Sequence, residues 1–77
     1  MKLDDYKNLT HTQQKTILNI VGIPIAKRQE NYFAYQLYSL DNFYVEICQL
    51  NEAFSYIKAF TSVDALDPYL NAINIPF

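Results

Sequence analysis

The chain has 77 residues and a formal net charge of −2, and 51% of its residues are hydrophobic. This length allows one domain, over residues 1–77, and the single cysteine, Cys48, excludes an internal disulfide. With a single histidine, His11, and few, scattered basic residues, the composition disfavours a metal site and a nucleic-acid surface. No apolar run of about 18 residues and no secretory signal stand out, so we expect a cytoplasmic protein without a membrane span.

The helical spacing of apolar residues predicts a helix over 11–21, preceded by a short helical turn within 3–9. Thr10 and Gln13 match a capping box, which satisfies the free N–H groups of a helix start. Gly22 directly follows the last apolar residue of the stripe. We therefore expect it to adopt the left-handed conformation of a helix C-cap.

Four segments rich in β-branched and aromatic residues are predicted to form strands: 23–27, 32–39, 43–50 and 54–60. Pro24 cannot donate to a ladder, which places the first strand at an edge or a strand start. Residues 29–31 are predicted to turn. Because all the connections are short, we expect an antiparallel sheet in sequence order.

Two registers are open for the central hairpin. A two-residue loop pairs Leu40 with Phe43, whereas a three-residue loop pairs Ser39 with Phe43. We predict the second, because it collects the apolar side chains on one face. That face then holds Phe33, Tyr35, Leu37, Phe43, Val45, Ile47, Ile57 and Ala59.

A last helix is predicted after the cap Ser62, with apolar side chains at helical spacing and a break at Pro68: Leu66, Tyr69, Leu70 and Ile73. The order α-β-β-β-β-α predicts a two-layer α+β domain. A four-stranded antiparallel meander would carry both helices on its apolar face.

The opposite face is the candidate interaction surface, and the sequence places seven residues there or beside it: Tyr32, Gln36, Tyr38, Tyr44, Glu46, Tyr56 and Lys58. Tyrosine is favoured at protein interfaces because it buries a large area with little loss of entropy. The alternative is that cross-strand tyrosine pairs only stabilise a solvated face. Stacking of nucleic-acid bases would need basic neighbours, and few are present. Cys48 and His11 fall on different elements, so no catalytic pair is expected.

Three stretches resemble a family of short bacterial proteins to which no activity is assigned: YSLDNFYVE at 38–46, IKAFTS at 57–62 and LDPYL at 66–70. That family shares an L-x-x-FYVE hairpin, an I-R-A-F-x-S strand end and an L-x-PYL helix. The resemblance extends loosely over residues 3–75 and more closely over 32–73. It implies the same strand order and a bacterial source, and it implies no catalytic residue.

We therefore expect a non-enzymatic protein-interaction module without a cofactor, which binds a partner protein or forms a homodimer through the tyrosine-rich face. An inhibitor of the immunity-protein or antitoxin type is the alternative, and a small-molecule binder is a third hypothesis.

Overall fold

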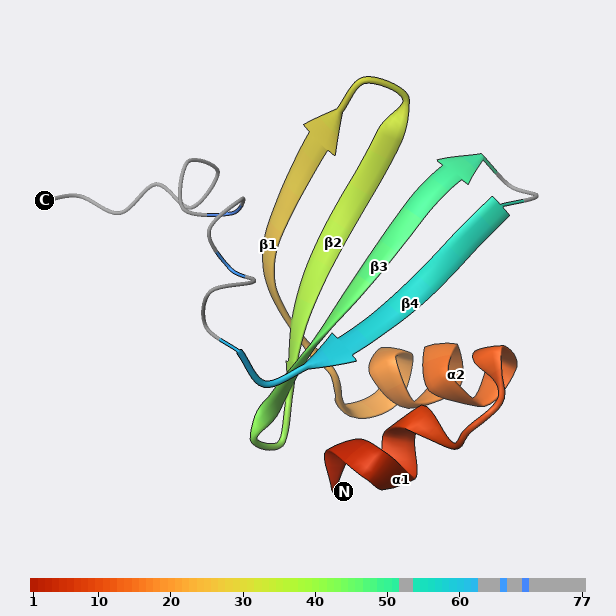
Figure 1. Cartoon of the computed structure of the whole chain (residues 1–77), viewed down its shortest axis with the longest axis vertical. Helices are drawn as coiled ribbons and strands as arrows, with labels where there is room; N and C mark the ends of the chain where they lie inside the picture. The colour runs from red at the N-terminus through yellow and green to blue at the C-terminus, as the bar shows by residue number, and fades with distance from the viewer. Residues whose placement is uncertain (52–53, 63–65, 67–68, 70–77) are drawn as a thin grey trace, which may run out of the picture.

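The computed structural model describes residues 1–51, 54–62, 66 and 69 (Figure 1). Two helices are followed by four strands: α1 (Leu3–Lys7), α2 (His11–Val21), β1 (Ile23–Glu30), β2 (Phe33–Leu40), β3 (Phe43–Asn51) and β4 (Phe54–Phe60). The strands form one open antiparallel sheet in the order β1-β2-β3-β4, which confirms the predicted α+β class and the meander. Figure 1 shows both helices at the end of the sheet that holds the β2–β3 turn, while the β1–β2 hairpin extends away from them.

The predicted bounds of α2 are confirmed, and so is its capping box. The Thr10 hydroxyl accepts a hydrogen bond from the Gln13 amide at 3.1 Å, and the Gln13 side chain accepts one from the Thr10 amide at 3.0 Å. The expected left-handed Gly22 is wrong, because its φ of −68° and ψ of 140° are those of extended backbone. Glycine is required there for another reason: a Cβ would lie 2.6 Å from the carbonyl oxygen of Leu18.

The β1–β2 and β2–β3 hairpins close with two-residue turns. Asn31 and Asp41, the first residue of each turn, have φ values of 55° and 51°. Asn and Asp tolerate this left-handed region better than other residues that carry a Cβ. The turn predicted at 29–31 is displaced, because β1 continues to Glu30 and β2 begins at Phe33.

The predicted register of the central hairpin is wrong by one residue. Leu40 pairs with Phe43, and Leu37 pairs with Glu46, so the two-residue loop is the one that forms. Because strand side chains alternate between faces, this shift moves every β2 side chain to the face opposite the one expected. The prediction assumed a single apolar face, whereas the sheet buries apolar side chains on both.

One face, the helix face, packs against α1 and α2 around five buried residues: Tyr6, Leu18, Leu40, Phe43 and Val45. The other, the outer face, has a second cluster made of Leu37, Phe60 and Tyr69, with Ala26, Tyr35, Tyr44 and Leu66 around it. Leu66 and Tyr69 thus pack on the face opposite the helices, so for these two residues the expected position on the helix face is wrong. The rest of the predicted last helix beyond Ser62, with its predicted break at Pro68, lies outside the described residues.

Neither helix in the described part of the chain has the length and apolar character that a bilayer crossing requires.

Candidate functional site

The structure divides the seven predicted interaction residues among three places. Gln36 and Tyr38 lie on the helix face, because the register shift moves all of β2. Tyr32 lies in the β1–β2 turn and is 85% exposed. The remaining four share the outer face: Tyr44, Glu46, Tyr56 and Lys58.

Glu46 is only 8% exposed, and it is occupied within the molecule. Its carboxylate accepts a hydrogen bond of 2.7 Å from the hydroxyl of buried Tyr69, and Nη2 of Arg28 lies 3.9 Å from the same oxygen. The Arg28 guanidinium also stacks over the Tyr35 ring at 3.6 Å and donates to Glu30 at 2.7 Å. A buried carboxylate needs such partners to offset its lost hydration. This cluster therefore holds the Tyr69 side chain against the outer face.

Burial accounts for the ionisation behaviour of this cluster. It is the main cause that raises the pKa of Tyr69 above the usual tyrosine value, and the hydrogen bond and negative charge of Glu46 add to the rise. Burial lowers the pKa of Arg28, but the hydrogen bond to Glu30 and the negative charge of Glu46 act against it, and the net shift is upward. Tyr69 therefore keeps its proton and Arg28 keeps its positive charge. The two groups form a structural cluster and not an acid–base pair.

Cys48 is buried on the outer face between Tyr35 and Tyr56, its partners on the two neighbouring strands. Burial, followed by hydrogen bonding with Cys48, raises the pKa of Tyr56 to about 12. His11 lies on the opposite face, where its Nε2 is 3.2 Å from the Ser55 hydroxyl. A histidine on that face cannot reach the thiol to activate it.

An exposed aromatic pair lies at the β4 side of the sheet. Phe54 is 47% exposed and Tyr56 is 41% exposed, and their rings meet edge to face with centroids 6.5 Å apart at 72°. Lys58 follows on the same face and is exposed. These three residues, Phe54, Tyr56 and Lys58, are called the β4 aromatic edge below. The predicted interaction surface includes Tyr56 and Lys58 and leaves Phe54 out.

The β1 side of the sheet also exposes apolar side chains, but β1 is protected against pairing with another strand. Ile23 is 64% exposed and Ile25 is 43% exposed. Pro24 lacks a backbone donor, and the pairing of β1 shifts at Ile25, between Pro24 and Ala26. Proline and bulges are devices by which edge strands resist pairing with another strand. The described β4 has no proline, and the register shift in its pairing with β3 is confined to its first residues, between Gln49 and Asn51 of β3, so β4 is the more open edge of this sheet.

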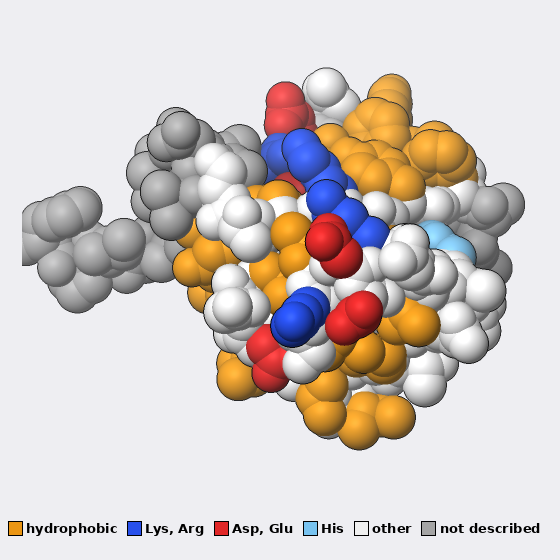
Figure 2. Space-filling model, turned by 60° about the horizontal axis from the view of Figure 1, so that its bottom comes forward, with side chains coloured by type: hydrophobic (Ala, Val, Ile, Leu, Met, Phe, Trp, Pro, Cys, Tyr) orange, Lys and Arg blue, Asp and Glu red, His pale blue; other side chains and the backbone are white. Residues whose placement is uncertain are grey.

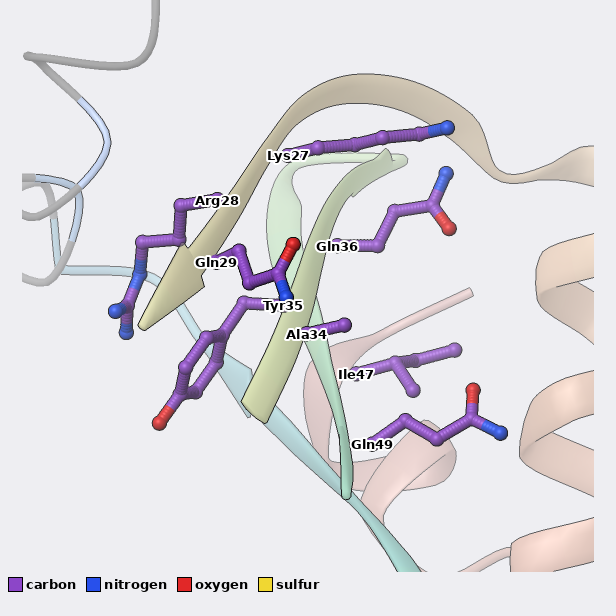
Figure 3. A pocket seen from close by; sticks show the side chains of 8 residues that line it. All are labelled: Lys27, Arg28, Gln29, Ala34, Tyr35, Gln36, Ile47 and Gln49. Atoms are coloured by element: carbon purple, nitrogen blue, oxygen red, sulfur yellow. The ribbon is translucent and has the colours of Figure 1, made fainter. Parts of the chain in front are cut away.

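A hollow of about 430 Å³ opens beside β1 and β2 (Figure 3). Figure 3 shows Lys27, Gln36 and Gln49 on one side of the sheet, and Arg28 and Tyr35 on the other. Ligand pockets are typically apolar with a few converging polar groups. This hollow is lined mainly by amides and cations that do not converge on one point, so it supports no ligand hypothesis.

The surface charges are mixed in sign. Figure 2 shows Lys and Arg side chains across the centre of one face with Asp and Glu side chains among them, and hydrophobic side chains in separate groups around them. In residues 1–51, 54–62, 66 and 69, no group of three or more His, Cys, Asp or Glu side chains is arranged to hold a metal ion. Phosphate binding normally needs a continuous basic face, which this view does not show.

Comparisons with protein-family models, with curated proteins and with solved structures find no match. The resemblance of residues 32–73 to short bacterial proteins stays a prediction.

Proposed function

We propose that this chain is a non-enzymatic protein-interaction module whose binding surface is the β4 aromatic edge. The observation that carries the proposal is the exposed, mutually packed pair of Phe54 and Tyr56 on the more open edge strand. Aromatic residues are enriched at the centres of protein interfaces, where they contribute more binding energy than most other types.

The revised surface is smaller than the predicted one for a physical reason. Tyr38 packs against the helix-side core, and Tyr44 packs against Phe60 with ring centroids 5.9 Å apart. Glu46 holds Tyr69. A partner could engage these side chains only by displacing internal contacts, whereas Phe54 and Tyr56 are already exposed.

Photo-crosslinking in cells tests this proposal. A photoreactive phenylalanine analogue is placed at Tyr56 in one variant and at Tyr32 in a matched control, because both are exposed tyrosines on different hairpins. We expect a discrete protein adduct from position 56 and none from position 32. Adding Phe54→Ser to the first variant should remove the adduct, since it breaks the aromatic pair.

No adduct at position 56, or equal adducts at both positions, would show that the β4 aromatic edge is not a binding surface.

A further inference from the structure

We infer that the occupant of the β4 aromatic edge is a second copy of this chain, whose β4 pairs antiparallel with the first β4 about Ile57. This inference rests on the proposed function and names the partner.

The sequence of β4 is complementary to itself. The strand reads F-S-Y-I-K-A-F from Phe54 to Phe60. Antiparallel pairing about Ile57 places Phe54 opposite Phe60 of the second copy, and Ser55 opposite Ala59 of the second copy. It also places Tyr56 opposite Lys58 of the second copy. Phe60 is only 9% exposed and already packs on Tyr44, so Phe54 gains little from it. The complementary contacts are therefore small with small and a ring with a cation, and two-fold symmetry forms each of them twice.

This register agrees with the faces of the sheet. Residues that pair across antiparallel strands lie on the same face, and Phe54, Tyr56, Lys58 and Phe60 all lie on the outer face. Centring the pairing on Lys58 would set two like charges opposite each other. Centring it on Tyr56 would pair only residues 54–58 of the two strands and leave the end of each β4 unpaired. Pairing about Ile57 uses the whole strand and avoids both faults.

The backbone of β4 is available for such pairing. In the described part of the chain β4 has one strand neighbour, β3. An edge strand with free N–H and C=O groups is a ready template for another strand. Pairing of two β4 edges would join the sheets of the two copies into one continuous sheet, and the protected β1 strands would form its ends.

Sedimentation equilibrium of the purified full chain tests the inference. Two variants place opposite charges at the same exposed position, Tyr56. The wild type should dimerise. Tyr56→Lys sets a lysine opposite Lys58 of the second copy at two symmetric sites, so the dissociation constant should rise at least about tenfold. Tyr56→Glu removes the same ring but sets a carboxylate opposite Lys58 of the second copy, so the constant should rise by a factor at least about three times smaller than for Tyr56→Lys. Tyr32→Lys on the other hairpin should leave it unchanged.

Circular dichroism and urea unfolding first establish that each variant is folded. A wild type that is monomeric up to about 0.5 mM overturns the inference, because even weak specific dimers form at that concentration. Equal weakening by Tyr56→Lys and Tyr56→Glu, or weakening by Tyr32→Lys, overturns it as well. If the wild type is monomeric while the adduct at position 56 contains a different protein, this inference fails and the proposed function stands. If no adduct forms either, both fail.

Discussion

Removing the hydroxyl of Tyr69 should destabilise the fold, because that hydroxyl donates to the buried carboxylate of Glu46 at 2.7 Å. Tyr69→Phe keeps the ring and its packing. It leaves the Glu46 carboxylate, 8% exposed, with Nη2 of Arg28 at 3.9 Å as its remaining described partner. Hydrogen bonds to charged groups contribute about 1.5–3 kcal/mol. We expect the free energy of unfolding to fall by about 2 kcal/mol, which in a domain of this size lowers Tm by roughly 10 °C.

Urea unfolding at pH 7, followed by circular dichroism, measures this loss. Tyr44→Phe is the matched control, because Tyr44 lies on the same face and its described contact is the stacking of its ring on Phe60. The control should cost less than about 0.5 kcal/mol. In a Glu46→Gln background, Tyr69→Phe should cost less than it does alone, since the charge that the hydroxyl serves is gone. If Tyr69→Phe costs no more than Tyr44→Phe, the hydrogen bond from the Tyr69 hydroxyl to Glu46 does not stabilise the fold.

Two further predictions concern the helices. Burial raises the pKa of Tyr6 to about 12 from the ordinary value of 10.0, so below pH 10 both the folded and the unfolded chain keep this proton. Between pH 10 and 12 the unfolded chain loses it first, so the free energy of unfolding falls there. Tyr6→Phe should reduce the difference between the free energies of urea unfolding at pH 8 and pH 11 by about 1 kcal/mol, and an unchanged difference would refute this. Gly22→Ala should destabilise the fold by about 1–3 kcal/mol in thermal unfolding, because its Cβ meets the Leu18 carbonyl. Gly22→Asn should destabilise the fold at least as much as Gly22→Ala does. If Gly22 were a left-handed cap, Asn would destabilise the fold less than Ala.

The elements of this fold could be predicted because their signals are local. Thr10 and Gln13 define the start of α2, and the alternation in residues 54–60 defines β4 and its two faces. The hairpin register could not be settled in the same way. The register depends on whether the sheet buries apolar side chains on one face or on both. The second face is buried by Leu66 and Tyr69, which lie far along the chain from the hairpin.

In the candidate site, too, the local sequence pattern predicted some positions correctly and misplaced others. Tyr56 and Lys58 lie on the predicted face because the alternation of β3 and β4 was interpreted correctly. Gln36 and Tyr38 were misplaced together by the one-residue shift of β2. The burial of Glu46 follows from Tyr69, 23 residues away, and no local pattern indicates that pairing.

The central claim is that β4 is the more open, self-complementary edge of the sheet, and amide hydrogen exchange at low and high protein concentration tests it most directly. Strand pairing protects the amides that point outward from the edge. We predict that the outward-pointing amides of β4 exchange more slowly as the concentration rises, while those of β1 exchange at unchanged rates. Exchange in β4 that is independent of concentration, or slowing confined to β1, would contradict the claim.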